Sequence, residues 1–210
     1  MASASQALSL RFMWGVNSGK RGSGASSLGL EFLDEKTVVY AAGHSIVLYD
    51  TEEKKQRFIG GSTEDDGFSA TAMCPSKRFF AVAEMSPDHA SIVVFDLRTL
   101  RKRKVLTAAA SCSRYSSICF SRDNETLLAL AGTTIVSWRG AIGKVTGELA
   151  LSLGGGRPEV QEFFQCSFSK LENIVAACAT TGIVFARVDA EELSALPSFS
   201  SSLNAESTIL

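Results

Sequence analysis

Four short apolar runs recur along the chain at nearly constant spacing. Each begins with Ile-Val and reaches an aromatic residue within the next three positions: residues 46–50, 92–96, 135–139 and 183–187. Their first residues, Ile46, Ile92, Ile135 and Ile183, are separated by 46, 43 and 48 residues. A repeat of this length is typical of the blades of a β-propeller. Successive residues of a strand point to opposite faces of its sheet. Because these runs are β-branched and apolar at consecutive positions, they predict strands that are buried on both faces.

Each run belongs to a predicted unit of four strands separated by polar turns. The units span residues 28–62, 68–107, 115–153 and 160–188. The strands expected within them cover residues 29–32, 37–41, 45–49 and 56–59, then 69–73, 78–83, 91–96 and 103–106, then 116–120, 126–130, 133–138 and 145–151, and finally 164–168, 173–178 and 182–187. The sequence therefore predicts an all-β protein, a partial β-propeller of about four four-stranded antiparallel blades.

Such units need neighbours, because no single blade buries both of its own faces. Four blades either close into a small ring or form part of a longer propeller, and we favour the second alternative. Outside the blades, residues 1–27 are expected to hold an N-terminal strand over 8–16 and a flexible Gly/Ser loop over 17–27. Residues 189–210 are Ser-rich and predicted to be a disordered tail, with a helical turn over 190–193.

Composition restricts the compartment and the class of partner. The 210-residue chain is 45% hydrophobic and 20% charged, which is ordinary for a globular protein. Its formal net charge is −1, so the chain as a whole has no positive electrostatic field that would attract nucleic acid or an anionic membrane. An odd number of cysteines without a Cys-x-x-Cys pair argues against a disulfide framework and a zinc ribbon. They are Cys74, Cys112, Cys119, Cys166 and Cys178. With no apolar run long enough for a bilayer and no secretory signal, we expect a soluble, intracellular protein.

The N-terminus leaves one alternative open. Residues 1–30 contain Arg11, Lys20 and Arg21, many serines and no acidic residue, which superficially matches an organelle transit peptide, although we favour the strand and loop.

Sequence motifs for catalysis are incomplete. Residues 15–21 resemble a phosphate-binding P-loop, but only three residues separate the glycines and Arg21 replaces the required hydroxyl residue. Residues 24–28 miss the nucleophile elbow because Leu28 replaces its second glycine. The two histidines, His44 and His89, lie in predicted turns without a nearby Cys or carboxylate cluster. The sequence therefore predicts a non-enzymatic protein without a catalytic, cofactor or metal site.

One basic stretch is the strongest charge feature. Five cations occur within residues 98–104: Arg98, Arg101, Lys102, Arg103 and Lys104. They predict either a contact for an acidic partner or an outer strand whose solvated cations protect a sheet edge from stray pairing. Because no aromatic residue alternates with them, single-stranded nucleic acid is disfavoured.

We expect structural roles for several residues at the ends of the strands. Trp138 and Tyr49 are predicted to pack between neighbouring sheets. Asp50 and Asp96 are predicted to bind the amides of the turns that follow them. Asn124 begins a glycosylation sequon, which matters only in a secreted protein.

The turn at residues 120–123, Phe-Ser-Arg-Asp, and the strand ends Tyr49-Asp50 and Phe95-Asp96 resemble degenerate WD repeats. More specific sequence similarity is found at residues 32–38, 56–62, 75–84 and 101–106. In order and spacing these stretches resemble the first blades of the cilia- and flagella-associated protein 57 family. The resemblance covers residues 10–151 well and residues 164–187 weakly, whereas the Ser-rich tail matches nothing in that family.

The resemblance implies a WD40-type fold and a scaffold of the motile axoneme that helps to place and regulate inner dynein arms on doublet microtubules. It implies localisation to the cytoplasm, the cytoskeleton and the cilium or flagellum. It also implies protein partners, namely axonemal or dynein-arm components with tubulin as a candidate, and no cofactor, nucleic acid, membrane or small-molecule substrate. The family's later blades, second propeller and coiled coil are missing from this chain. A generic intracellular WD-repeat adaptor is the alternative, and a propeller hydrolase is disfavoured because no His and carboxylate set converges.

Overall fold

All regular structure in the described part of the protein is β-strand. The computed structural model describes residues 12–13, 29–60, 67–108, 112–140, 145–153, 163–170, 172–179, 182–189, 192–197 and 199–200. Within these ranges there is no helix of the length and hydropathy needed to cross a membrane.

The strands form four antiparallel sheets, and within each sheet consecutive strands pair, except that the last strand of the fourth sheet pairs with the third strand of that sheet. The first sheet contains β1 (Leu30–Phe32), β2 (Thr37–Ala42), β3 (Ser45–Asp50) and β4 (Lys55–Gly60). The second contains β5 (Phe68–Met73), β6 (Phe79–Glu84), β7 (Ser91–Asp96) and β8 (Arg101–Leu106). The third contains β9 (Ser117–Phe120), β10 (Thr126–Ala131), β11 (Thr134–Arg139) and β12 (Val145–Ala150). The fourth contains β13 (Phe163–Phe168), β14 (Ile174–Ala179), β15 (Gly182–Val188), β16 (Leu193–Ala195) and β17 (Phe199–Ser200).

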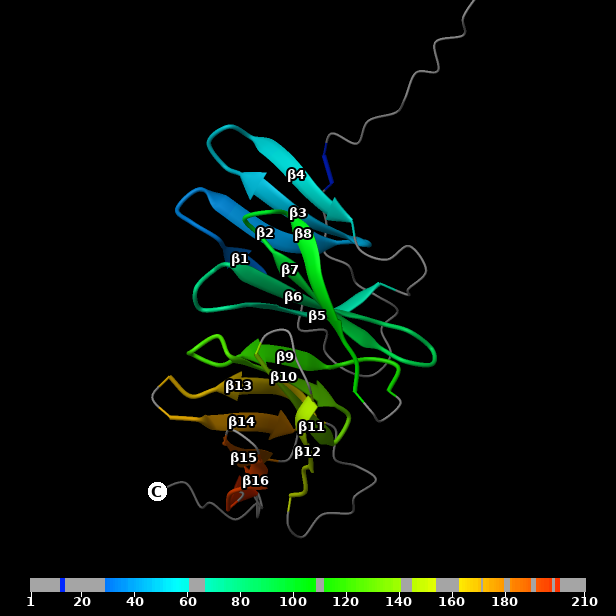
Figure 1. Ribbon diagram of the computed structural model, residues 1–210, viewed down its shortest axis with the longest axis vertical. Coiled ribbons are helices and arrows are strands. Elements are labelled where there is room, and N and C mark those ends of the chain that lie inside the picture. Colours follow the sequence, from blue (N-terminus) through cyan, green and yellow to red (C-terminus); the bar gives the residue numbers. More distant parts are fainter. Residues whose placement is uncertain are drawn as a thin grey trace, which may run out of the picture.

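This architecture confirms the predicted fold class of four antiparallel blades. Figure 1 shows the first sheet at one end of the long axis, the second sheet next to it, and the third and fourth sheets together at the opposite end. The described strands therefore form an open stack, and the closed four-blade ring that the sequence allowed is not formed.

The fourth sheet corrects one expectation about the C-terminal segment. We expected blade structure to end at residue 188 and a helical turn to cover 190–193, but β16 pairs with β15 through Val188 and Leu193, and β17 pairs with it through Ile183 and Phe199. Leu193 is buried, at 8% exposure. A short outer strand in a Ser-rich segment depends on a tertiary partner, which local composition does not reveal. Residues 201–210 of the predicted tail lie outside the described residues.

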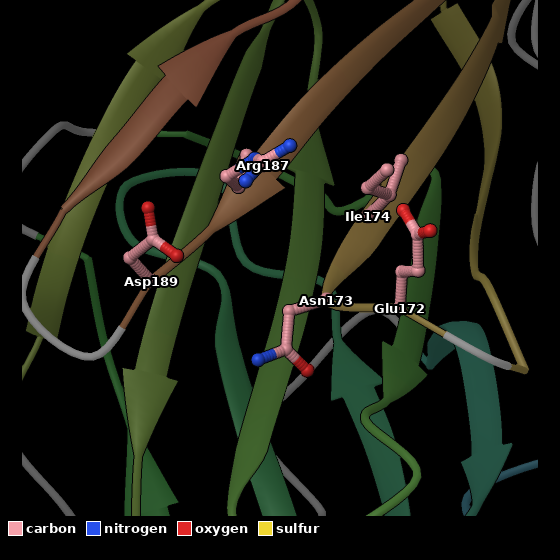
Figure 2. A pocket seen from close by; sticks show the side chains of 5 residues that line it. All are labelled: Glu172, Asn173, Ile174, Arg187 and Asp189. Atoms are coloured by element: carbon pink, nitrogen blue, oxygen red, sulfur yellow. The ribbon is translucent and has the colours of Figure 1, made fainter.

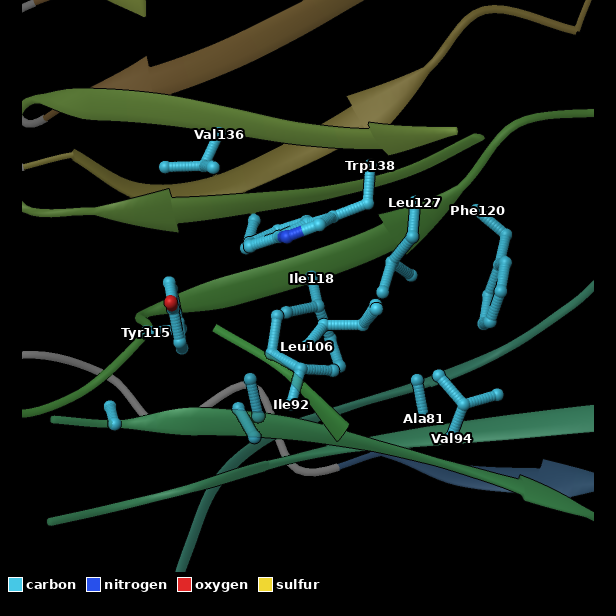
Figure 3. Packing of buried hydrophobic residues seen from close by; sticks show 14 of the residues in the cluster. Ala81, Ile92, Val94, Leu106, Tyr115, Ile118, Phe120, Leu127, Val136 and Trp138 are labelled. Atoms are coloured by element: carbon cyan, nitrogen blue, oxygen red, sulfur yellow. The ribbon is translucent and has the colours of Figure 1, made fainter. Parts of the chain in front are cut away.

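Apolar side chains fill the spaces between successive sheets. β7 shows the principle most clearly, because Ile92, Val93 and Val94 are all fully buried. Val93 faces the core between the first and second sheets, whereas Ile92 and Val94 face the core between the second and third (Figure 3). Burying one such side chain is worth about 1.5–3 kcal/mol relative to leaving it in water. The prediction that these runs are buried on both faces is confirmed in β3, β7 and β11. It is wrong for the fourth run, on β15, where Ile183 is 40% exposed and Phe185 is half-buried.

Trp138 lies at the centre of the core between the second and third sheets. It is 1% exposed, and its ring meets that of Tyr115 edge to face, with centroids 6.1 Å apart. Its indole Nε1–H donates to the carbonyl of Thr107 at 3.4 Å. The prediction that Trp138 packs between sheets is therefore confirmed, while Tyr49 on β3 is half-buried.

Polar contacts also join neighbouring sheets. The amide of Cys166 on β13 donates to the hydroxyl oxygen of Ser117 on β9 at 3.2 Å, and Ser117 is 1% exposed. In the turns, the amide of Ser76 donates to Oδ1 of Asn124 at 2.9 Å. Both bonds join neighbouring blades, and the buried one at Ser117 contributes more to their placement, because a buried donor is costly to leave without an acceptor.

The N-terminal segment is described only at Phe12 and Met13, which are not part of a strand. The amide of Met13 donates to Oε1 of Gln56 at 2.6 Å, and its carbonyl accepts the Tyr40 hydroxyl at 2.9 Å. Met13 therefore lies against the first sheet. The rest of the predicted strand and loop lies outside the described residues.

Candidate functional site

The five cations predicted as a partner contact lie together at the edge of the second sheet. Arg98 is exposed in the turn that precedes β8, and Arg101, Lys102 and Arg103 are exposed on β8 itself, while Lys104 is half-buried. β8 is the outermost strand of its sheet. Within the described ranges, none of the five forms an ion pair with an acidic side chain. We call the residues Arg98, Arg101, Lys102, Arg103 and Lys104 the basic edge.

One member of the basic edge has a separate role. A register shift between Val94 and Phe95 of β7 leaves Arg103 without a directly opposite residue on the neighbouring strand. Its guanidinium lies 5.9 Å from the ring centroid of Phe79, and the guanidinium of Arg78 lies 4.9 Å from the same centroid. Such cation–π contacts at exposed sites are worth about 0.5–1 kcal/mol. Arg103 is therefore tied to its own sheet.

Sequence reasoning did not foresee Phe79 and Arg78 as neighbours of the basic edge. The pairing depends on the extra residue in β8, which changes the direction of the Arg103 side chain. A bulge of this kind has no signature in a run of five cations, so only the three-dimensional register shows it.

Asp96 holds the turn that leads into β8. Its Oδ1 accepts the amides of Arg98 at 2.9 Å and Thr99 at 3.3 Å, and its Oδ2 accepts Nε–H of Arg78 at 3.2 Å. Burial alone would raise the pKa of this carboxyl, but the hydrogen bonds from the two amides and from Arg78 outweigh it and lower the pKa below the ordinary value of 3.8. Leu100 then adopts a left-handed backbone conformation, at φ 55°, before the strand begins.

The first sheet repeats this turn at Asp50. Its Oδ1 accepts the amides of Glu52 at 2.9 Å and Glu53 at 2.8 Å, and Lys54 takes the left-handed conformation at φ 54°. The prediction that Asp50 and Asp96 bind turn amides is confirmed. Both turns end in an outer strand, so these aspartates determine where the outer strands start.

The basic edge has the chemistry of a contact for an acidic surface. Its exposed cations are not neutralised by described neighbours, and they project from a strand that has one side free of a described partner strand. At physiological salt such charges act over about 8 Å, so they favour an acidic surface that approaches closely.

In the part of the chain that the structure describes, the two histidines do not lie in a group of potential catalytic or metal-binding side chains. His44 lies in the β2–β3 turn and His89 precedes β7, and both are exposed. Among the residues that the structure describes, no three His, Cys, Asp or Glu side chains are grouped closely enough to hold a metal ion. The P-loop-like residues 15–21 and the residues 24–28 lie outside the described residues.

A polar depression of about 430 Å³ opens on the fourth sheet (Figure 2). Glu172, Asn173, Ile174, Arg187 and Asp189 line it, and all except Ile174 are exposed. Its described lining contains no serine, cysteine or histidine, so it does not have the residues of a serine or cysteine hydrolase.

Comparison with known proteins finds relatives of one kind. The chain is 30% identical over 150 residues to cilia- and flagella-associated protein 57 C of Tetrahymena thermophila, an alignment that covers 66% of this chain and 11% of that protein. It is 32% identical over 100 residues to cilia- and flagella-associated protein 57 of Mus musculus, covering 46% of this chain and 8% of the mouse protein. The resemblance to the cilia- and flagella-associated protein 57 family is thereby confirmed.

The protein 57 relatives are accompanied by a second cilia- and flagella-associated protein. The chain is 31% identical over 113 residues to cilia- and flagella-associated protein 44 of Mus musculus, covering 52% of this chain and 6% of the relative. The chain thus spans about a tenth of the length of the protein 57 relatives. No family model matches the sequence.

Proposed function

We propose that this chain acts as part of a non-enzymatic scaffold of the cilium or flagellum, in which stacked β-blades present surfaces to other proteins. The observation that carries the proposal is the 30% identity over 150 residues to cilia- and flagella-associated protein 57 C. The structure is consistent with it, because its best-organised functional feature is a charged edge and not a cavity with catalytic groups.

The more specific form of the proposal places the chain on the axoneme. There it helps to position and regulate inner dynein arms on doublet microtubules, as a WD-repeat protein of the cytoskeleton. Its partners are then axonemal or dynein-arm proteins, with the acidic surface of tubulin as a candidate. An intracellular WD-repeat adaptor without a ciliary role is the alternative.

The basic edge is the surface proposed to make this contact. Arg103 lies against Phe79, which leaves Arg98, Arg101, Lys102 and Lys104 for an acidic partner. A single exposed ion pair contributes about 0–1 kcal/mol, so affinity requires several pairs at once. Binding of this kind weakens as salt screens the charges.

Cosedimentation of the purified chain with axonemal doublets tests the contact. The test variant carries Arg101→Glu, Lys102→Glu and Lys104→Glu, which spares Arg103. The matched control carries Arg57→Glu, Lys77→Glu and Lys170→Glu, three exposed cations elsewhere that give the same change in net charge.

We expect the chain to pellet at low salt and to be released as salt rises, the test variant to lose binding at every salt concentration, and the control to keep it. Equal binding by the test variant at low salt would remove the basic edge from the proposal. The ciliary role is tested separately, by locating a tagged chain in a ciliated cell. Signal confined to the cytoplasm outside the axoneme would favour the generic adaptor.

A further inference from the structure

Two thiols face each other across the contact between the third and fourth sheets. Cys119 lies on β9 and Cys166 on β13, the first strands of their sheets, and their Sγ atoms are 3.6 Å apart. Both cysteines are free thiols in the structure. Cys166 is 5% exposed and Cys119 is half-buried, so the pair lies inside the fold.

We propose that Cys119 and Cys166 form an oxidation site, at which a hydroperoxide converts the two thiols into a disulfide that joins the third and fourth sheets. A disulfide bond is about 2.05 Å long, so the two sulfur atoms need to approach by about 1.5 Å. The strands are already held together beside the pair, because the amide of Cys166 donates to Ser117 at 3.2 Å.

The two thiols are not equivalent. A hydrogen bond from the Cys119 thiol, assisted by Ser117 and opposed by burial, lowers the pKa of Cys166. The same hydrogen bond, together with burial, raises the pKa of Cys119 well above its ordinary value. The thiolate, which is the reactive form, is therefore favoured at Cys166.

The reaction takes place in two balanced steps. The Cys166 thiolate attacks one oxygen of the hydroperoxide, the O–O bond breaks, and the other oxygen leaves as water or an alcohol after taking up a proton, which gives a sulfenic acid. The Cys119 thiol then loses its proton and attacks the Cys166 sulfur, the S–S bond forms, the S–O bond breaks and water leaves. The two thiols are oxidised by two electrons and the peroxide is reduced by two.

The remaining cysteines have different surroundings. The Sγ of Cys74 lies 3.2 Å from the hydroxyl of Ser76 and accepts the amide of Phe79 at 3.0 Å, which gives it a structural role in a turn. Burial raises the pKa of Cys112, which makes its thiolate scarce. Cys178 lies on β14. Because Cys119 and Cys166 are the two cysteines whose sulfur atoms are described in contact, oxidation is expected to select this pair.

The test treats the purified full chain with hydrogen peroxide, blocks the remaining thiols with an alkylating reagent in denaturant, and maps the peptides by mass spectrometry. We expect the number of free thiols to fall from five to three and the peptides of Cys119 and Cys166 to be linked with the loss of two hydrogen atoms. Cys119→Ser and Cys166→Ser should each abolish the link, whereas Cys178→Ser should keep it. Dithiothreitol should restore all thiols.

A second readout does not depend on variants folding well. In the oxidised chain, amide hydrogen exchange should slow in β9 and β13 but not in β2 and β3. Closing a loop of 47 residues should also raise the melting temperature by about 5–10 °C. The proposal is wrong if Cys119 and Cys166 are still alkylated separately after the other thiols have reacted, or if their peptides link only in the unfolded or dimeric chain.

Discussion

Replacing Asp96 by alanine tests how the turn before the basic edge is stabilised. The substitution removes an acceptor from the amides of Arg98 and Thr99 and from the Arg78 side chain. Asp50→Ala is the matched control, because Asp50 accepts two turn amides in the same way but has no arginine partner and is half-buried.

The magnitude follows from these bonds. Losing a carboxylate that caps two backbone amides costs about 0.5–2 kcal/mol, and this is the expected cost at Asp50. At Asp96 the arginine pair adds about 0.5–1 kcal/mol, a discounted value because the Arg78 side chain is 44% exposed, and the empty space of a buried side chain adds a similar amount. We therefore expect Asp96→Ala to lower the free energy of unfolding by about 2–3 kcal/mol and Asp50→Ala by about 1 kcal/mol.

Urea denaturation, followed by circular dichroism, measures both variants. The loss of stability in acid should also be smaller in Asp96→Ala than in the parent chain. Because the folded pKa of Asp96 is lowered below 3.8, its contribution is fully present above that value and is lost as the pH falls through the lower, folded pKa. Equal losses for the two variants, or an unchanged acid dependence in Asp96→Ala, would refute this explanation.

Substitutions at three further positions test the backbone conformation and the packing. Lys77→Gly should stabilise the chain by about 0.5–1 kcal/mol in urea denaturation, because Lys77 is exposed at φ 56°, and Lys77→Val should destabilise it. Trp138→Ala should cost about 3–5 kcal/mol and Trp138→Phe clearly less, because phenylalanine keeps an aromatic contact with Tyr115. Gly147→Ala should lower the melting temperature, because its new Cβ would lie 3.2 Å from Cδ1 of Leu193, and the loss should disappear in a Leu193→Ala background. No effect in the first case, equal costs in the second, or an additive loss in the third would contradict these expectations.

The blades could be predicted from the sequence because each strand is specified by its own short run of residues. A run such as Ile92, Val93 and Val94 cannot face water on either side, so its pattern alone requires a strand between two apolar layers. Polar turns between such runs then indicate antiparallel pairing with the next strand. The placement of Trp138 in the core follows from the same reasoning.

Other features arise only when distant segments meet. The contact between Cys119 and Cys166 requires the register of one sheet on the next, which no local pattern specifies. The tie between Arg103 and Phe79 depends on a bulge in an outer strand, and the strand at Leu193 depends on its pairing with Val188. The sequence therefore predicted the basic edge as a group of cations. It did not predict that Arg103 contacts Phe79 of its own sheet while the other cations remain available.

Amide hydrogen exchange at Cys166, measured by NMR, tests most directly whether neighbouring sheets stack through their first strands. This amide donates to Ser117, which belongs to the preceding sheet. We expect slow exchange in the parent chain and at least about tenfold faster exchange in Ser117→Ala, because a tenfold change corresponds to about 1.4 kcal/mol and the loss of one buried hydrogen bond is of that size. The amide of Val82 on β6 should be unchanged. Rapid exchange at Cys166 in the parent chain, or no response to Ser117→Ala, would contradict the stacked arrangement.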